Sequence, residues 1–263
     1  MSEISQLFDV NGQFGQDPAL RQPPQFVQGK VTDNADKQNA GMVKVEFLSW
    51  KSGSNICQWM PLLRPYAGAG YGLYAVPEVG DIVLVGFLGS EMRRPFVMGV
   101  LYPAGAKYPG QQFTEKNFTK SFRTKGGCEV TFSDEQNKEK VTVATPGGLQ
   151  VDLDDGAQAV TVTDKNGKNL LKLDCKNGQA SLTANAKITL KTGSCTLTMD
   201  GQSGKIQLEG NTVAVSAKQQ FTAEGKAGLS LTSSASAKLE GTAGLTLKSS
   251  AMAQLSGSMV KIN

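Results

Sequence analysis

The C-terminal part of the chain carries two columns of apolar residues that repeat with a period of eight. Both columns are apolar through six repeats, starting at Val213 and at Val215. Their members are Val213, Phe221, Leu229, Ala237, Leu245 and Ala253, and then Val215, Ala223, Leu231, Leu239, Leu247 and Leu255. Two residues separated by one lie on the same side of an extended chain. Each repeat therefore predicts one short strand followed by a corner.

The same spacing occurs upstream with less regular intervals. Apolar pairs separated by one residue occur at Val141/Val143, Val151/Leu153, Val160/Val162, Leu171/Leu173, Ile188/Leu190, Cys195/Leu197 and Ile206/Leu208. Glycines at 225, 241 and 257 are sixteen residues apart, which is two repeats. The pattern predicts a stack of short strands over the whole C-terminal half.

A strand repeat this short buries only a narrow stripe and cannot enclose a core by itself. We therefore expect three intertwined chains, each providing one wall of a prism around a shared axis. The predicted trimer core is Val213, Val215, Phe221, Leu229, Leu231, Leu239, Leu245, Leu247 and Leu255. A fibre or adhesin-like stalk would show the same repeat and is the alternative at this point.

Proline and aromatic residues divide the chain into two parts. All ten prolines lie at or before Pro146, and only Phe122, Phe132 and Phe221 among the aromatic residues lie beyond residue 119. Proline would remove a ladder hydrogen bond in any stacked strand, so its absence fits the predicted stack. We place an N-terminal arm at 1–24, a first domain at 25–102, a linker at 103–122 and the needle at 123–263.

The first domain has the pattern of short strands separated by turns. Strands are predicted at 26–31, 42–47, 56–60, 82–87 and 96–101. Five strands in so short a segment favour a small closed barrel, because closure removes exposed strand edges. The fold class expected for the chain is all-β.

Composition excludes several classes of function. The chain has no histidine, so Ser-His-Asp catalysis and histidine-ligated metals are excluded. The four cysteines, at 57, 128, 175 and 195, form no C-x-x-C pair and are expected to be reduced, buried apolar groups. The net charge of +4 arises beyond residue 119, from dispersed lysines. Lys44 and Lys51 lack interleaved aromatics beyond Phe47 and Trp50, so no nucleic acid partner is expected. A fibre or adhesin-like stalk whose first domain binds a ligand or nucleic acid remains the alternative.

Three other patterns contain residue types that could support chemistry. Gly68, Gly70 and Gly72 resemble a phosphate-binding loop but precede no expected helix, which favours a barrel turn. Calcium ligands could come from Asp152, Asp154 and Asp155 or, more weakly, from Asp9 and Asn11. A carboxylate pair for glycoside hydrolysis could come from Glu78, Asp81 and Glu91. We expect none of these sites to form, and hence no catalytic residue, cofactor or metal.

Several motifs of the first domain resemble a known family. They are Gly41-Met-Val-Lys-Val-Glu-Phe47, Trp59-Met-Pro61, Arg64-Pro-Tyr-Ala-Gly-Ala-Gly-Tyr-Gly72, Val76-Pro-Glu-Val-Gly-Asp-Ile-Val-Leu-Val-Gly-Phe87 and Arg94-Pro-Phe-Val-Met-Gly-Val-Leu-Tyr102. In this order they resemble the OB-fold domain of contractile-tail spike proteins. That family includes phage baseplate assembly protein V and the valine–glycine repeat proteins of type VI secretion. Residues 124–148 resemble the family's entry into its β-helix.

The resemblance implies a homotrimer with an OB-fold collar and a triple-stranded β-helix that punctures a target membrane without enzymatic activity. The chain lacks the length for a fused hub domain, so a separate baseplate hub protein is expected on the N-terminal side. The eight-residue register slips near Val260, which predicts that Val260, Lys261, Ile262 and Asn263 bind a PAAR-repeat-like tip protein. Since no signal peptide is visible, we expect synthesis in the cytoplasm and delivery outside the cell within a phage tail or secretion apparatus.

Overall fold

The computed structural model describes residues 26–48, 57–88, 94–105 and 115–262. Seventeen strands occur in these ranges, and no helix occurs in them. Nor does this part of the chain contain a helical segment with the length and hydropathy of a membrane span. Contacts divide the chain into two units, Met1–Asn185 and Ala186–Asn263, which are described separately. The all-β class predicted from the sequence is confirmed.

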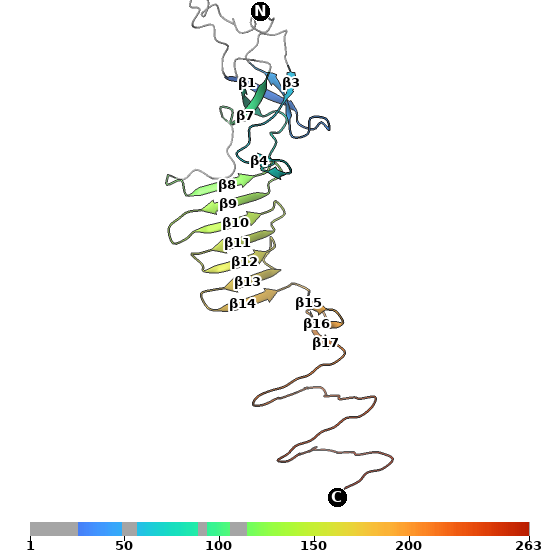
Figure 1. Ribbon diagram of the computed structural model, residues 1–263. Coiled ribbons are helices and arrows are strands. Elements are labelled where there is room, and N and C mark those ends of the chain that lie inside the picture. Colours follow the sequence, from blue (N-terminus) through green and yellow to red (C-terminus); the bar gives the residue numbers. More distant parts are fainter. Residues whose placement is uncertain (1–25, 49–56, 89–93, 106–114, 263) are drawn as a thin grey trace, which may run out of the picture. The chain divides into compact units, whose positions relative to one another are not determined.

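The N-terminal domain is a five-stranded antiparallel sheet in the order β3-β2-β1-β6-β7 (Figure 1). Its strands are β1 (Phe26–Asp33), β2 (Val43–Phe47), β3 (Cys57–Met60), β6 (Ile82–Phe87) and β7 (Pro95–Leu101). Each lies on a strand predicted from the sequence. In β1 and β2, alternate residues are buried, as expected for strands that cover a core with one face.

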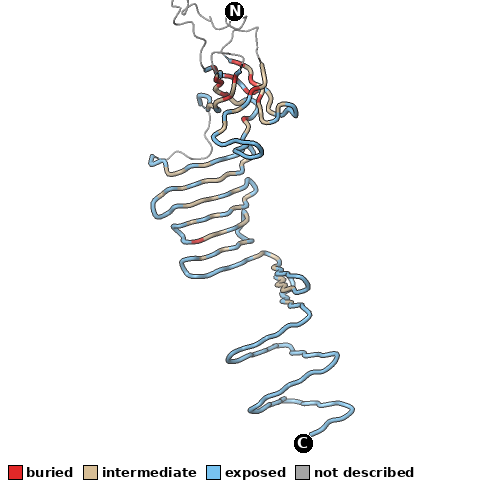
Figure 2. Tube along the Cα trace, in the orientation of Figure 1, coloured by how far each residue is buried: buried red, intermediate tan, exposed pale blue. Residues whose placement is uncertain are grey.

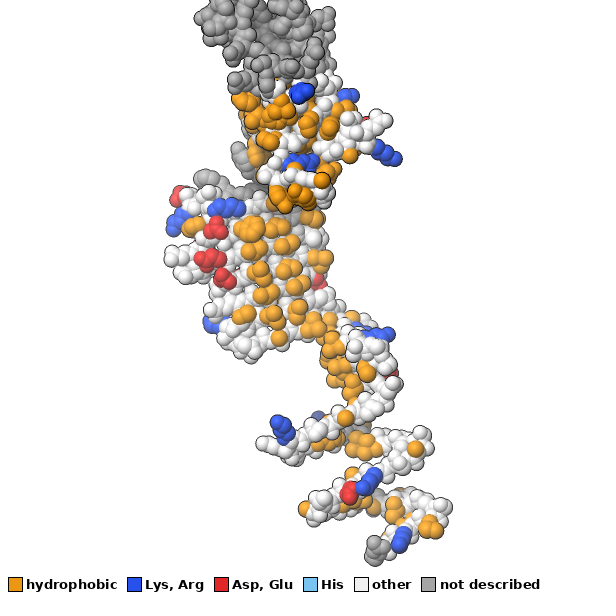
Figure 3. All heavy atoms as spheres, in the orientation of Figure 1, with side chains coloured by type: hydrophobic (Ala, Val, Ile, Leu, Met, Phe, Trp, Pro, Cys, Tyr) orange, Lys and Arg blue, Asp and Glu red, His pale blue; other side chains and the backbone are white. Residues whose placement is uncertain are grey.

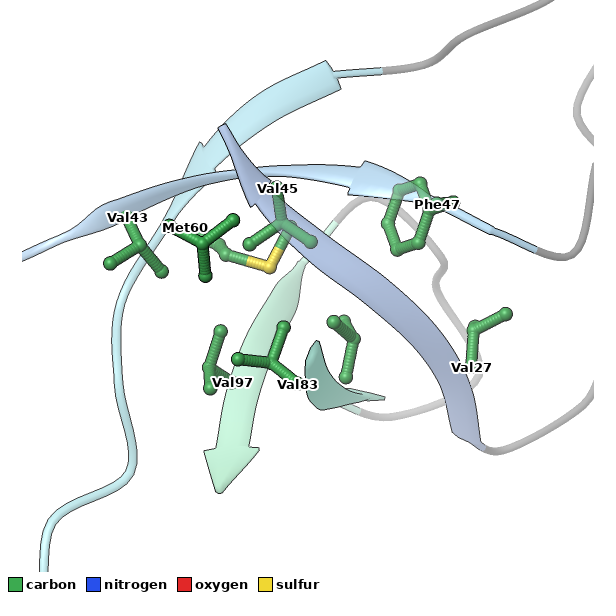
Figure 4. Close-up of a cluster of buried hydrophobic side chains, with 9 residues drawn as sticks. Val27, Val43, Val45, Phe47, Met60, Val83 and Val97 are labelled. Carbon is green, nitrogen blue, oxygen red and sulfur yellow. The ribbon is translucent and has the colours of Figure 1, made fainter. Parts of the chain in front are cut away.

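The sheet curls around a core of apolar side chains (Figure 4). The buried cluster consists of Val27, Val31, Val43, Val45, Phe47, Met60, Val83, Val85 and Val97. The barrel closes where the chain after β3 meets β7. There Val97 donates to the carbonyl of Pro61 at 2.8 Å, and Leu63 donates to the carbonyl of Val97 at 2.7 Å. This pairing covers an edge that would otherwise be exposed.

A seven-stranded antiparallel sheet follows in the same unit, and each strand pairs with the next one along the chain. Its strands are β8 (Thr119–Arg123), β9 (Glu129–Ser133), β10 (Lys140–Ala144), β11 (Gln150–Asp154), β12 (Ala159–Thr163), β13 (Leu170–Asp174) and β14 (Gln179–Thr183). β8 begins inside the segment predicted as a linker. Figure 2 shows that burial is concentrated in the N-terminal barrel, whereas the residues of this sheet are partly or fully exposed apart from Ala159.

The second unit begins with a three-stranded antiparallel sheet. Its strands are β15 (Lys187–Thr192), β16 (Cys195–Asp200) and β17 (Lys205–Glu209). Residues 210–262 then follow an extended path that contains no assigned strand, and they are exposed throughout. Bends occur at residues 218, 226, 234, 242, 250 and 258. The backbone therefore turns every eight residues, at the period that the apolar columns predict.

One feature differs from the expectation of an intertwined winding from residue 123 onward. The ladders of β8–β14 and of β15–β17 form within a single chain. The turns between most of these strands are short enough for a hairpin, so each strand meets its own neighbour first. From residue 210 to residue 262, by contrast, no strand pairs with another part of the chain.

Candidate functional site

The candidate functional surface is one face of the seven-stranded sheet, where two rows of apolar side chains cross the strands. The ladder registers place one member of each row on every strand. The first row is Phe122, Val130, Val143, Val151, Val162, Leu171 and Leu182, and the second is Lys120, Phe132, Val141, Leu153, Val160, Leu173 and Ala180. Figure 3 shows hydrophobic side chains gathered over this sheet. We call these two lines the apolar rows.

The apolar rows are not covered in the single chain. Phe122 is 57% exposed, Leu153 is 49% exposed and Leu182 is 52% exposed. Contiguous apolar surface of this kind marks an interaction site in soluble proteins. The four predicted pairs from Val141/Val143 to Leu171/Leu173 lie on this face, and the structure adds Phe122, Val130, Phe132, Ala180 and Leu182 to them.

The apolar rows have a counterpart on β15–β17. Leu190 pairs with Leu197, which pairs with Leu208, and Ile188 pairs with Met199, which pairs with Ile206. The sequence paired Cys195 with Leu197, whereas the ladder places Met199 beside Leu197 in the rows. Cys195 lies on the same face but opposite Thr192, one position beyond the rows.

The predicted trimer core residues between 213 and 255 are all exposed in the single chain. Leu231 is 88% exposed and Leu247 is 77% exposed. Leucine side chains held in a regular extended path and left in water are a strong indication of a missing partner surface. Of the residues predicted to bind a tip protein, Val260, Lys261 and Ile262 are exposed, and Asn263 lies outside the described residues.

Two kinds of corner alternate along this path. A Cβ atom at Gly225 would overlap the carbonyl oxygen of Gly228, and one at Gly241 would overlap that of Gly244. At the intervening corners, the backbone N–H of Ala235 donates to Ser233 Oγ and that of Ala251 donates to Ser249 Oγ. The sixteen-residue spacing of the glycines therefore reflects an alternation of glycine and serine corners.

The other face of the seven-stranded sheet is polar and carries cross-strand ion pairs. Lys140 Nζ lies 3.2 Å from Asp152 and 3.5 Å from Asp154, across the β10–β11 hairpin. Partial burial opposes ionisation of Asp152, yet hydrogen bonds from Thr142 at 2.7 Å and Gln150 at 2.6 Å bring its pKa below the ordinary value. These bonds help to fix the register of the sheet, and they make this face polar.

A similar pair lies on the three-stranded sheet. Lys187 Nζ lies 2.8 Å from Asp200, its direct partner in the β15–β16 ladder. This contact, followed by a hydrogen bond from the backbone N–H of Ser203, holds the pKa of Asp200 well below its ordinary range. The carboxylate thus stabilises the hairpin turn after β16 as well as the strand pairing.

The calcium alternative is not supported by the arrangement of these carboxylates. The ammonium group of Lys140 occupies the position between Asp152 and Asp154 that a cation would take. Asp155 lies in the turn after β11, where its backbone N–H donates to the carbonyl of Glu139 at 2.9 Å. Among the described residues no group of acidic or cysteine side chains is arranged to hold a metal. Asp9 and Asn11 lie outside those residues.

The glycine cluster at 68–72 forms a tight hairpin, as the sequence favoured. β4 (Ala67–Gly68) pairs with β5 (Tyr71–Gly72). A Cβ atom at Gly68 would overlap the ring of Tyr71, and Gly72 adopts a φ of 138°. Arg64 anchors the hairpin by donating to the carbonyls of Leu73 at 2.8 Å and Gly41 at 3.1 Å. The glycines therefore allow close packing of the backbone and ring, and they do not form a phosphate cradle at a helix N-terminus.

The carboxylates weighed for glycoside hydrolysis serve structural contacts. Asp81 accepts a hydrogen bond from the backbone N–H of Glu78 at 2.9 Å, and Glu78 forms an ion pair with Lys125 at 3.3 Å. Glu91, the third predicted member, lies outside the described residues. Lys51 and Trp50 of the basic segment also lie outside them, whereas Lys44 pairs with Trp59 in the β2–β3 ladder.

The prediction that the cysteines are buried is wrong for the single chain. Cys128, Cys175 and Cys195 are exposed, and Cys57 is partly exposed with its Sγ 3.2 Å from Thr32 Oγ1. Cys128 and Cys175 belong to connections between strands, where a small sheet offers no interior. All four are free thiols, as predicted.

Comparison with known proteins matches the barrel to a defined domain. Residues 27–102 match the type VI secretion system/phage-baseplate injector OB domain. The matched segment runs from β1 to the end of β7 and contains every strand of the barrel. The barrel is therefore an OB domain of the injector type. It precedes the sheet that carries the uncovered apolar rows.

Relatives with known names support the same assignment. The chain is 31% identical over 130 residues to the type VI secretion system spike protein VgrG1c of Pseudomonas aeruginosa PAO1. The aligned segment covers 47% of this chain and 18% of that protein. The chain is 32% identical over 125 residues to VgrG5 of the same strain, covering 44% and 16%. It is 30% identical over 110 residues to the actin cross-linking toxin VgrG1 of Vibrio cholerae, covering 38% and 10%.

The matched segments span a fifth or less of these relatives' length. Within that span, the chain is similar to type VI secretion system spike proteins, and its barrel matches the type VI secretion system/phage-baseplate injector OB domain. The recognition made from the sequence motifs is confirmed at this level.

Proposed function

We propose that this protein is the central spike of a contractile injection machine. Three copies associate around one axis, cover their apolar rows and apolar columns, and form a needle. The spike acts mechanically and without chemistry of its own. It is made in the cytoplasm, and the contracting apparatus carries it out of the cell and into the target envelope.

The uncovered apolar rows are the observation that carries this proposal. One row continues over seven strands without a polar member, and the other has a single exception at Lys120. A sheet of this size with one apolar face reaches stability by packing that face against another layer. The curated relatives are named as spike proteins, which favours self-association into a spike over a fibre stalk.

A stacked arrangement also explains how the needle would resist bending and compression. Each strand of β8–β14 is hydrogen bonded to both neighbours except at the two ends of the sheet. Bending such a stack stretches many ladder bonds at once, and closely packed side chains on the axis oppose compression. This mechanical role needs no bound cofactor or metal.

The partners at the two ends are part of the same proposal. The N-terminal side would meet a separate hub of the baseplate, and Val260–Asn263 would meet a PAAR-repeat-like tip protein. Val260 is 48% exposed and Ile262 is 84% exposed, so apolar surface is available near the tip. Truncation of the last six residues should abolish capture of the tip protein in a pull-down; unchanged capture would count against this contact.

The function itself is tested in the source organism by deletion of the gene. We expect that contractile particles lose delivery into target cells, and that the wild-type chain restores it. Leu231→Asn should fail to restore delivery, whereas Ser230→Asn, on the adjacent outward position, should restore it. Full delivery by the deletion strain would overturn the proposed role.

A further inference from the structure

Two turns of the seven-stranded sheet carry the same three residues in a row. Lys165-Asn166-Gly167 lies between β12 and β13, and Lys176-Asn177-Gly178 lies between β13 and β14. These residues are all exposed, and a Cβ atom on either glycine would meet no atom within 4 Å. Both glycines adopt a positive φ, of 66° and 64°. The two turns therefore offer one chemical group, an exposed asparagine followed by an unhindered glycine, in two different settings.

This group can modify itself, because asparagine is thermolabile and a glycine without a Cβ atom lets its own nitrogen approach closely. The glycine nitrogen forms a bond to Cγ of the asparagine and gives its proton to a solvent base. The Cγ–Nδ2 bond breaks, and the amide nitrogen leaves as ammonia after taking a proton from water. One water molecule then opens the cyclic imide, at Cγ to give aspartate or at the main-chain carbonyl carbon to give isoaspartate. Each event thus replaces a neutral amide by a carboxylate.

The amide of Asn177 is held by Asp174. Nδ2 of Asn177 donates to both carboxylate oxygens of Asp174, at 3.2 Å each, and the backbone N–H of Asn177 donates to Oδ1 at 3.0 Å. Hydrogen bonds to a charged acceptor are about twice as strong as those between neutral groups. Rotation of the Asn177 side chain toward the nitrogen of Gly178 breaks both bonds to Nδ2. The carboxylate also repels the negative charge that forms on the attacked amide oxygen.

The amide of Asn166 is not held in this way. The carboxylate of Asp164 accepts hydrogen bonds from the backbone N–H groups of Asn166 at 3.1 Å and Lys168 at 3.0 Å, and from Nδ2 of Asn169. Within the described part of the chain, no hydrogen bond holds the side chain of Asn166. Attack at this turn is opposed by a neutral backbone bond, from the N–H of Gly167 to the carbonyl of Asp164 at 3.1 Å. Such a bond in an exposed turn opens more readily than an amide bound to both oxygens of a carboxylate.

We propose that Asn166 is a site of spontaneous deamidation in the folded protein, and that Asp174 protects Asn177 from the same reaction. The protection lies where the reaction would do most harm. Among the described strands, β14 is the last of its sheet and pairs with β13. A carboxylate at position 177 would lie against that of Asp174 and remove the donor that closes the turn. A carboxylate at position 166 leaves in place the backbone bonds to Asp164. This inference is independent of the spike role proposed above.

Ageing of the full-length protein tests the proposal. The folded protein and the same protein in guanidinium are incubated at mildly alkaline pH and then digested with chymotrypsin, which separates the two turns by cleaving after Leu170 and Leu173. Mass spectrometry measures aspartate and isoaspartate at each site. In guanidinium the two asparagines should react at similar rates, because both follow lysine and precede glycine. In the folded protein Asn166 should react several-fold faster than Asn177, and equal rates there would overturn the inference.

Variants of the two turn aspartates assign the protection to one carboxylate. Asp174→Ala should raise the rate at Asn177 to that at Asn166 and leave the rate at Asn166 unchanged, which also shows that the first turn stays folded. Asp164→Ala is the matched control and should leave Asn177 protected. Asp174→Asn, of the same size, replaces Asp174→Ala if that variant reacts at both sites as in guanidinium. A slow Asn177 in the Asp174 variant, or a fast Asn177 in Asp164→Ala, would show that this carboxylate is not the protecting group.

Discussion

The carbonyl oxygen of Gly244 occupies the space that a Cβ atom on Gly241 would need, whereas a Cβ on Gly244 itself would meet no atom within 4 Å. These two glycines lie at the same corner, so they make a matched pair. Overpacking of this kind costs about 1–3 kcal/mol. Gly241→Ala should lower the thermal midpoint of the needle measured by circular dichroism, and Gly244→Ala should leave it near that of the wild type. Equal midpoints for the two variants would show that the corner is not built as described.

The apolar columns make a second prediction. Leu231→Asn would place one polar amide per copy at a position that self-association buries, and each buried unpaired polar group costs about 1–3 kcal/mol. A symmetric assembly repeats this cost in every copy. Sedimentation velocity should show a reduced fraction of oligomer for Leu231→Asn and for Leu247→Asn. The outward variant Ser230→Asn should assemble as the wild type does, and normal assembly of both leucine variants would count against the packing.

Hydrogen bonds and ion pairs to three carboxylates on the two sheets predict how stability depends on pH; those of Asp174 come from Asn177, with Lys172 at 3.4 Å. Folding lowers the pKa of Asp152, Asp174 and Asp200 from an ordinary value of 3.8. A carboxyl with a lowered folded pKa stabilises the folded state above its unfolded pKa and loses that contribution as pH falls through the folded pKa. The urea midpoint should therefore be nearly constant from pH 8 to about pH 5 and should fall below about pH 4.

The same pairs supply the control for that experiment. Asp200→Asn removes the partner of Lys187 and should reduce the fall in the urea midpoint on acidification. Asp134→Asn removes an exposed surface pair with Lys120, at 2.9 Å, and is expected to have a smaller effect. A profile for Asp200→Asn identical to that of the wild type would show that this carboxylate does not stabilise the hairpin.

Arg64 makes a prediction for the barrel. Its guanidinium donates to two backbone carbonyls and lies 5.0 Å from the centre of the Tyr74 ring. Arg64→Met should destabilise the barrel by about 1–3 kcal/mol in urea unfolding monitored at the barrel, because two carbonyls lose a charged donor. Arg64→Lys should recover only part of that loss. An ammonium is a charged donor, but it lacks the planar fork that reaches both carbonyls. An unchanged midpoint for Arg64→Met would show that the hairpin needs no anchor.

Much of the fold could be predicted because its determinants are local. Alternation in residues such as Val43 and Val45 marks the barrel strands, and the eight-residue columns mark the bends from 218 to 258. The ladder of β8–β14 was harder to predict. A pair such as Val151/Leu153 looks the same whether its neighbour belongs to the same chain or to another copy. The length of each connecting turn decides between pairing within the chain and pairing with another copy. Upstream of residue 210, the connections between strands permit hairpins.

The candidate site was predicted in part for a related reason. The sequence identified the apolar pairs but not their extension to Phe122, because β8 begins before the first clear repeat. The sequence pattern also paired Cys195 with Leu197. Cys195, Leu197 and Met199 alternate on one face, and a period of two does not tell which two of them continue the rows. Register depends on the partner strand, and here Ile188 and Leu190 select Met199 and Leu197.

Three copies of this chain are expected to share one apolar axis. Sedimentation equilibrium of the full-length protein measures this most directly, because it reports mass independently of shape. We expect a single species with three times the 27.9 kDa mass of one chain. A species with the mass of one chain, at concentrations where the barrel is folded, would contradict it.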